Sequence, residues 1–196
     1  MCQTFLNDAN FYALLLQIDQ ELAAPVQGGG CRYCGGKLHR ADYPRKPRGV
    51  ARRVLGEGYE RRISFCCAEA GCRCRMTPAS VRFLGRRVYL GVIVVLSAVL
   101  SGGVTAKRAR YLGEHLGVGG RTLERWRRWW REGFVGTPFW QWARGYFSPP
   151  PRSERLPASL LECFAAEGLA GQVIALLRFI APLSTVGAIG AQRQGI

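Results

Sequence analysis

The stretch that decides the fold opens with Cys31-Arg32-Tyr33-Cys34-Gly35-Gly36 and closes with Cys66-Cys67-Ala68-Glu69-Ala70-Gly71-Cys72-Arg73-Cys74. Six of the eight cysteines of the chain lie in these two clusters. A Cys-x-x-Cys-Gly-Gly turn brings two thiolates to one side of a tight knuckle. A second cysteine cluster across a hairpin completes a tetrahedral site of four sulfurs, the geometry that structural zinc prefers. The pattern predicts a zinc ribbon over residues 31–80, with Zn2+ as its cofactor.

Two cysteines from each cluster are the predicted metal ligands: Cys31, Cys34, Cys67 and Cys72. The second pair is preferred because a four-residue gap that contains Gly71 can turn back onto one ion. Cys66 remains an alternative to Cys67, and Cys74 an alternative to Cys72. The 32 residues from 35 to 66 between the inner ligands exceed the usual ribbon spacing of roughly 15–20.

We expect no secretory signal at the N-terminus, because it lacks a positively charged segment and acidic residues interrupt its apolar ones. Paired cysteine clusters without such a signal indicate metal ligands rather than disulfides. We therefore expect a reducing, cytoplasmic setting. Cys2 and Cys163 stand alone and are expected to be free thiols.

The net charge of +15 is unevenly distributed: residues 1–30 carry −3, residues 31–131 carry +17 and residues 132–196 carry +1. A concentrated basic segment is typical of a protein that binds a polyanion. Arg accounts for 25 of the 28 basic residues, and its planar fork suits phosphates and guanine edges. A GC-rich genome is an alternative cause of the preference for Arg over Lys, but it does not explain the net charge.

Between the cysteine clusters, residues 42–53 are too rich in Pro and Arg for a core strand. They form either a solvated loop or a basic arm that follows phosphates, and the predicted DNA contacts of such an arm are Arg45, Lys46 and Arg48. The following stretch, Tyr59–Cys66, alternates like a strand, with Ile63 and Phe65 on one face and Arg62 and Ser64 on the other.

Residues 1–30 are predicted to form an N-terminal helix and a linker. An apolar stripe recurs at helical spacing over residues 8–24, comprising Phe11, Leu14, Leu15, Ile18 and Leu22. Asp8 is the expected N-cap, and Pro25 is expected to stop the helix.

Residues 81–133 are predicted to form a helix-turn-helix domain. Residues 88–106 hold no charge, but the strongly apolar part is too short for a bilayer of about 30 Å and fits a buried core helix instead. Two short helices follow, with the glycine turn at Gly117 between them. Leu112 and Leu116 face inward from the first of these helices, and Val118, Leu123 and Trp126 from the second.

The second helix, about residues 120–131, is the predicted recognition helix. Its N-terminal part and outer face carry Arg121, Glu124, Arg125 and Arg128, and such residues reach base edges when a helix enters the major groove. The predicted phosphate contacts at the start of the preceding helix are Lys107, Arg108 and Arg110. A basic solvated helix in a small bundle is the alternative. We expect the Trp129–Trp130 pair to pack in the core rather than stack on bases.

Residues 134–196 are predicted to be a C-terminal helical region that caps the core, with dimerisation or partner docking as its second role. An aromatic helix is expected over Pro138–Phe147, followed by amphipathic helices over Pro157–Glu167 and Leu169–Pro182. These last two helices are joined at Gly168, and the last dozen residues are expected to be frayed.

No catalytic constellation is visible. Strand-transfer chemistry generally needs two or three convergent carboxylates that hold Mg2+. The chain has only three aspartates, Asp8, Asp19 and Asp42, and none lies beyond residue 42. His39 and His115 have no evident nucleophile or base as a partner, and no glycine-rich phosphate loop is present. The sequence therefore predicts a protein that is not an enzyme.

The order of these motifs resembles the N-terminal region of bacterial insertion-sequence transposases of the DDE type. The resemblance rests on Cys31, Cys34, Cys67, Cys72, Arg75–Pro78 and the helix-turn-helix at 109–128, roughly half of the chain. In that group, a zinc ribbon precedes the DNA-binding helices and a catalytic domain follows. We find no such domain within these 196 residues, so the resemblance implies a transposon-end or operator-binding protein without transposase activity.

The predicted fold class is mainly α with a small β zinc ribbon. The predicted function is non-catalytic binding of double-stranded DNA by a transposon-associated accessory factor or transposase derivative. An adaptor for a recombinase, transposase or polymerase and a transcriptional regulator are the alternatives, and RNA binding is a third. The expected partners are DNA and a transposase or recombinase, with a homodimer allowed and no membrane association.

Overall fold

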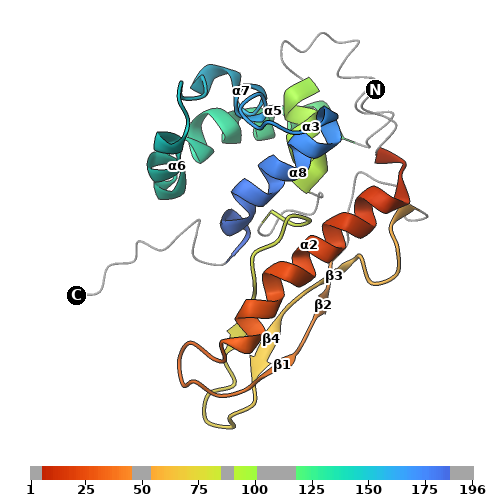
Figure 1. Cartoon of the computed structure of the whole chain (residues 1–196), viewed down its shortest axis with the longest axis vertical. Helices are drawn as coiled ribbons and strands as arrows, with labels where there is room; N and C mark the ends of the chain where they lie inside the picture. Colours follow the sequence, from red (N-terminus) through yellow and green to blue (C-terminus); the bar gives the residue numbers. More distant parts are fainter. Residues whose placement is uncertain (1–5, 46–53, 85–90, 101–117, 186–196) are drawn as a thin grey trace. The chain divides into compact units, whose positions relative to one another are not determined.

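The chain forms two compact units in the computed structural model, which describes residues 6–45, 54–84, 91–100 and 118–185. Unit 1 comprises Met1–Val88 together with Ile180–Ile196, and unit 2 comprises Tyr89–Phe179. The described part is mainly helical with small antiparallel sheets, which agrees with the predicted class at this coarse level (Figure 1). The four-part division proposed from the sequence stays a prediction.

Helix α2, Ala9–Gly28, begins unit 1 as the sequence predicts, since the side chain of Asp8 caps it and accepts a 2.9 Å hydrogen bond from the backbone N–H of Asn10. Its buried face comprises Phe11, Tyr12, Leu15, Ile18, Asp19 and Ala23. The expected inward position of Leu14 is wrong, because its side chain is 41% exposed.

Pro25 does not stop this helix, contrary to the prediction. It lies inside α2, and the helix continues to Gly28. A proline in the last turn removes a single hydrogen bond. The carbonyl of Pro25 still accepts a 2.9 Å hydrogen bond from the N–H of Gly29. The chain leaves the helix at Gly30, whose φ of 74° favours glycine.

The strands of unit 1 are short. Strands β1 (Leu38–Arg40), β4 (Phe65–Cys67) and β5 (Arg75–Met76) form one antiparallel sheet in the order β1-β4-β5. Strands β2 (Tyr43–Pro44) and β3 (Arg61–Arg62) form a separate pair. In the larger sheet, Leu38 lies opposite Cys67, and helix α2 packs against β1. The sheet therefore fixes the register of the two cysteine clusters.

The predicted strand over Tyr59–Cys66 is interrupted between β3 and β4. Its expected alternation is also wrong, because Arg62 and Ser64 are buried along with Ile63 and Phe65. Both polar side chains find hydrogen-bond acceptors: Arg62 donates to the carbonyl of Pro78, and Ser64 donates 3.4 Å to the carbonyl of Met76. Burial of polar groups with partners of this kind does not follow a two-residue period.

A fully buried ion pair joins α2 to the segment that follows β5. The carboxylate of Asp19 accepts from the guanidinium of Arg82 at 2.7 Å, from the hydroxyl of Ser80 at 2.6 Å and from the N–H of Val81 at 2.7 Å. Arg82 also donates to the carbonyls of Tyr59 and Arg61. Because every strong polar group has a partner, this network specifies how three segments of unit 1 meet.

Unit 1 also includes described residues that follow α8, Gly168–Ile180. The short 3-10 helix η5, Ala181–Ser184, carries the hydroxyl of Ser184, which accepts 2.8 Å from the N–H of Ser80. The buried guanidinium of Arg62 also reaches Ser184, at 3.5 Å, while its Nη1 has no partner among the described residues. Burial is the main cause that lowers the pKa of Arg62 below its usual value.

In unit 2, residues 91–96 at the start of α3 (Gly91–Leu100) are buried, which confirms the expected core helix over this part. Among the described residues, no helix has the length and apolar character to cross a membrane. Helix α3 packs against α5, Gly120–Arg128. The predicted first helix of the helix-turn-helix falls in residues 101–117, outside the described residues.

The recognition helix is predicted over residues 120–131, but α5 ends at Arg128 and continues as a π-helix, η2, over Trp129–Phe134. In η2, the indole of Trp129 lies over Gly133, where an added Cβ would come within 2.8 Å of it. Trp130 is fully buried and packs on Trp129 with ring centroids 4.8 Å apart. Trp130 therefore packs in the core as predicted, whereas Trp129 is half-buried against it.

The rest of unit 2 is helical. Helix α6 (Pro138–Ala143) and the 3-10 helix η3 (Arg144–Tyr146) occupy the predicted aromatic segment. The 3-10 helix η4 (Ser153–Arg155) and α7 follow, but α7 spans only Ala158–Leu161 and not the predicted 157–167. Helix α8, Gly168–Ile180, begins at the expected junction, where Gly168 has a φ of 67°.

Candidate metal centre and nucleic-acid interface

The first cysteine cluster forms a closed turn at the end of α2. The N–H of Cys31 donates to the carbonyl of Gly36 at 2.9 Å, and the N–H of Gly35 donates to the carbonyl of Cys31 at 2.7 Å. Gly35 takes a φ of 73°, which other residues rarely adopt. The turn therefore aims the sulfurs of Cys31 and Cys34 to one side of the chain.

The second cluster closes by a similar pattern after β4. The N–H groups of Cys72 and Arg73 both donate to the carbonyl of Glu69 at 3.0 Å, and Cys67 donates to the carbonyl of Cys74 at 3.0 Å. Arg73 has a φ of 47°, in the left-handed region. This tight turn returns Cys72 toward Cys67.

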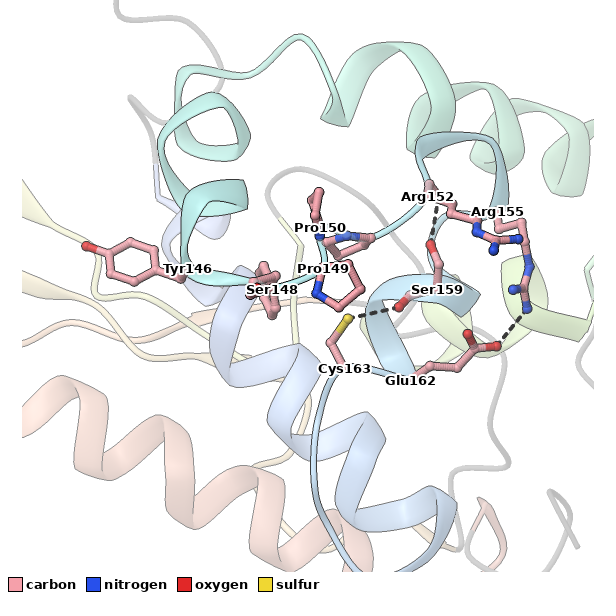
Figure 2. Close-up of a pocket in the computed structure, with 11 residues that line it drawn as sticks. Tyr146, Ser148, Pro149, Pro150, Arg152, Arg155, Ser159, Glu162 and Cys163 are labelled. Atoms are coloured by element: carbon pink, nitrogen blue, oxygen red, sulfur yellow. Dashed lines mark hydrogen bonds and ion pairs between the residues drawn. The ribbon is translucent and has the colours of Figure 1, made fainter.

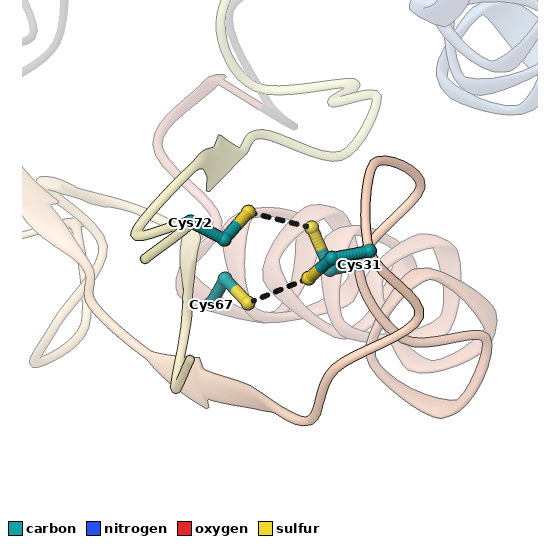
Figure 3. Close-up of side chains that lie close together, drawn as sticks. Cys31, Cys67 and Cys72 are labelled. Atoms are coloured by element: carbon teal, nitrogen blue, oxygen red, sulfur yellow. Dashed lines mark hydrogen bonds between the residues drawn. The ribbon is translucent and has the colours of Figure 1, made fainter. Parts of the chain in front are cut away.

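The four sulfurs of Cys31, Cys34, Cys67 and Cys72 lie within 4.8 Å of one another, and this group can hold a metal ion. The Sγ atoms of Cys31 and Cys72 are 3.7 Å apart, and those of Cys34 and Cys67 are 3.4 Å apart (Figure 3). A tetrahedral ion with metal–sulfur bonds of about 2.3 Å requires sulfurs about 3.8 Å apart. The observed spacing therefore fits a tetrahedral four-sulfur site.

Gly36 allows the two knuckles to approach this closely. A Cβ at this position would lie 2.5 Å from Cγ of Glu69, 3.2 Å from Sγ of Cys67 and 3.3 Å from Sγ of Cys34. The absence of a side chain at Gly36 thus leaves room for the sulfurs to converge.

The two alternative ligands considered from the sequence lie outside this group. Cys66 directs its Sγ to the carbonyl of Arg73 at 3.5 Å. Cys74 is half-buried and packs against the small apolar cluster of unit 1, which includes Leu38 and Phe65. The structure therefore brings together the four cysteines that the sequence favours.

The thiols of the cluster differ in acidity. The pKa of Cys72 is lowered to about 7, chiefly by the backbone N–H of Cys74, which donates to its sulfur. At Cys34 the N–H of Gly36 favours the thiolate, but the thiols of Cys67 and Cys72 together with burial outweigh it and raise the pKa to about 12. Since metal ions bind thiolates, occupation of this site must release protons.

Helix α5 separates apolar from basic side chains as the sequence predicts. Val118, Leu123 and Trp126 are buried, whereas the predicted DNA contacts on this helix, Arg121, Arg125 and Arg128, are exposed. Glu124 pairs with Arg127 at 3.5 Å. Among the described residues, no ion pair engages Arg121, Arg125 or Arg128.

The other predicted DNA contacts are only partly visible. Arg45 is half-buried at the end of β2, with its guanidinium 5.9 Å from the ring centroid of Phe83. Its backbone is fixed by a 2.6 Å hydrogen bond to the carbonyl of Glu60. The remaining predicted contacts lie outside the described residues: Lys46, Arg48, Lys107, Arg108 and Arg110.

Two features of the structure were not predicted from the sequence. The buried Asp19 carried a signal, because it follows Leu15 by four residues and therefore falls on the apolar face of α2. The second is an exposed aromatic pair, Trp142 and Tyr146, whose rings pack 4.8 Å apart. No sequence pattern distinguishes it from the buried aromatic residues beside it.

Comparisons with known proteins return no relative of this chain: no protein-family model, no curated protein and no solved structure matches it. The assignment of function therefore depends on the four-sulfur group and the arginine face of α5.

Proposed function

We propose that this chain is a non-catalytic DNA-binding protein in which a zinc ion in the four-cysteine site stabilises a ribbon and α5 acts as the recognition helix of a helix-turn-helix. The observation that carries the proposal is the exposed row of Arg121, Arg125 and Arg128 on α5. These residues are spaced i, i+4 and i+7, so they share one face of the helix.

The opposite face of α5 supports this role. Leu123 and Trp126 anchor the helix in the core of unit 2, so its arginine face is held rigidly. A face of this kind fits the major groove, which admits an α-helix and offers guanine acceptors to Arg. On this reading Arg121 and Arg125, nearer the N-terminus of the helix, contact base edges. Arg128 lies in the last turn, so in place of the base contact expected from the sequence we assign it to the phosphate backbone, which positions the helix without reading sequence.

The proposed zinc ion has a structural role. The four thiolates fill its coordination sphere, which leaves no open position for a substrate or water. Short strands with a small apolar core gain little from burial alone, so metal binding supplies folding free energy to this part of unit 1.

The aspartates of unit 1 also support a protein without catalysis. Asp19 is fully buried in its ion pair with Arg82. Asp42 pairs with Arg40 at 2.8 Å and accepts 3.1 Å from the N–H of Ser64. Two carboxylates engaged in this way do not form the convergent pair that holds catalytic Mg2+.

The resemblance to insertion-sequence transposases supports a narrower proposal, in which the bound DNA is a transposon end or an operator. The protein then acts as an accessory factor or a transposase derivative. Selection of bound duplexes from a random pool tests this step, because an inverted-repeat end or an operator yields a defined motif. A pool that stays random after selection would contradict it.

A salt titration of DNA affinity tests the proposal. We expect Arg128→Ala to lower the slope of log affinity against log salt by about 0.9, the value for one lost phosphate contact, and Arg125→Ala to relax sequence preference by about 1–3 kcal/mol at one position. Arg127→Ala is the matched control, because Arg127 already pairs with Glu124. Salt-independent binding, or equal effects of all three variants, would refute the assignment of α5.

A further inference from the structure

An aromatic pair stands on the surface of unit 2. Trp142 and Tyr146 are 67% and 69% exposed, and their rings meet edge to face with centroids 4.8 Å apart. Exposed apolar side chains that lie together can mark a place where another molecule binds.

This pair does not hold the unit together. On the same helix, Trp140 and Ala143 are buried, and Trp140 packs on Phe134 with ring centroids 4.9 Å apart. Helix α6 is therefore anchored through one face, and Trp142 projects from the other. The side chain of Trp142 therefore makes no contribution to the buried aromatic core, and its substitution should leave that core of unit 2 intact.

A pocket of about 550 Å³ begins at Tyr146, one member of this pair, and is lined by three prolines, Arg152 and Arg155. Trp142 does not line the pocket, and packs on Tyr146 at its edge. In Figure 2, Tyr146 lies at one end of the pocket, Pro149 and Pro150 lie in the middle, and Arg152 lies at the other end. The pocket has the size of known small-ligand sites. Aromatic and proline rings offer flat apolar faces on which a nucleobase can stack.

The charges at the pocket favour an anion. Arg155 pairs with Glu162 at 2.7 Å, whereas Arg144 and Arg152 are exposed and form no ion pair among the described residues. The segment 142–163 has three arginines against Glu154 and Glu162, a net charge of +1, and unit 2 as a whole has 12 basic and 6 acidic residues, a net charge of +6. A peptide rich in arginine or lysine is therefore disfavoured.

We infer that this surface binds a single-stranded stretch of nucleic acid, with bases stacked on Trp142 and Tyr146 and a phosphate held by Arg152. The inference rests on the proposed function only in taking nucleic acid as the partner. Stacking on aromatic side chains beside cations is how single strands bind without sequence preference.

The test uses the full-length protein with a fluorescent oligothymidylate and with a blunt duplex. We expect Trp142→Ala combined with Tyr146→Ala to weaken single-strand binding by at least about 10-fold, since the loss of even one stacked base accounts for a factor of about 10 to 100. Trp142→Phe with Tyr146→Phe retains a stacking surface and should recover most of the affinity. Blunt-duplex affinity should not change in either variant.

Cys163 supplies a second measurement, because its exposed thiol lines the same pocket. Bound oligonucleotide should slow alkylation of Cys163, followed by mass spectrometry, and the alanine pair should abolish this protection. Unchanged single-strand affinity in the alanine pair would overturn the inference, as would tighter binding of a proline-rich peptide than of the oligonucleotide. Loss of blunt-duplex binding in α5 variants alone would concern the proposed function and not this surface.

Discussion

The two units of the protein are stabilised by different kinds of interaction. Unit 1 has short strands, a cluster of four thiols and a buried network around the Asp19–Arg82 ion pair. Unit 2 is built around large apolar side chains, with Trp126, Trp130 and Phe134 fully or almost fully buried. Unit 1 thus adds a few directional interactions to the apolar core along α2, whereas the described part of unit 2 relies mainly on contacts between large apolar side chains.

This difference implies two patterns of failure. Removal of one partner from a directional network leaves the others buried and unsatisfied, so the loss is large and abrupt. A core of packed rings loses stability in smaller steps that follow the volume removed. All five tryptophans lie between residues 126 and 142, so tryptophan fluorescence reports unit 2 alone and allows the two patterns to be separated.

The largest effect is expected from loss of the metal. Cys31→Ser combined with Cys67→Ser should abolish binding of zinc and unfold the cysteine region of unit 1, because a structural zinc site contributes on the order of 10 kcal/mol. Metal analysis and limited proteolysis would detect the change. Tryptophan emission should stay native, since it reports unit 2.

Cys163→Ser is the matched control for this experiment, because Cys163 is an exposed thiol outside the four-sulfur group. It should leave metal content at one equivalent. A wild-type protein that folds and resists protease without metal would show that the four cysteines do not stabilise unit 1.

The next effect is expected at the buried ion pair. Asp19→Ala leaves the guanidinium of Arg82 buried without a counter-charge and should destabilise unit 1 by about 3–5 kcal/mol. Urea unfolding followed by hydrogen exchange in α2 would measure it. Arg40→Ala breaks the exposed pair with Asp42 and should cost no more than about 1 kcal/mol. If both variants lowered the free energy of unfolding by the same amount, the buried Asp19–Arg82 pair would contribute no more to stability than the exposed Arg40–Asp42 pair.

These residues also show what the sequence could predict. Cysteine spacing identified the group of four cysteines because its signal is local, and the period of α5 separated Leu123 from Arg125 for the same reason. The partners of Asp19 could not be predicted, since Ser80 and Arg82 follow it by more than 60 residues. The pairing of Asp19 with the buried Arg82 depends on tertiary contacts, which a local sequence pattern does not contain.

The end of α2 gives a second example. A proline usually marks a helix boundary, yet Pro25 lies in the last turn of α2 and the helix ends at Gly28. Three consecutive glycines decide this end, because Gly30 has the positive φ. The short α7 could not be predicted either, since periodicity sets the type of an element better than its length.

In unit 2, folding and binding should separate on one helix. Leu123→Ala empties a buried position of α5 and should destabilise unit 2 by about 2–5 kcal/mol, which tryptophan emission during urea unfolding would record. Arg125→Ala changes an exposed residue two positions away and should alter stability by less than about 0.5 kcal/mol, while it weakens DNA binding. If Arg125→Ala unfolds unit 2 instead, its side chain supports the fold and not an interface.

The smallest effect is expected at the start of α6. Thr137 caps this helix, as its hydroxyl accepts 3.1 Å from the N–H of Trp140 and donates 2.7 Å to the carbonyl of Phe134. Thr137→Ala should cost about 1 kcal/mol of stability, whereas Thr137→Ser keeps the hydroxyl and should cost less. Thermal unfolding followed by tryptophan emission would resolve the two variants.

This cap also connects the core of unit 2 to its surface. Helix α6 has six residues, so a frayed first turn loosens both the buried Trp140 and the exposed Trp142. We therefore expect Thr137→Ala to weaken single-strand binding slightly and blunt-duplex binding not at all. If Thr137→Ala weakened single-strand and blunt-duplex binding equally, loss of the cap would affect α5 as well as α6. The surface at Trp142 would then not be separable from the core that anchors α5.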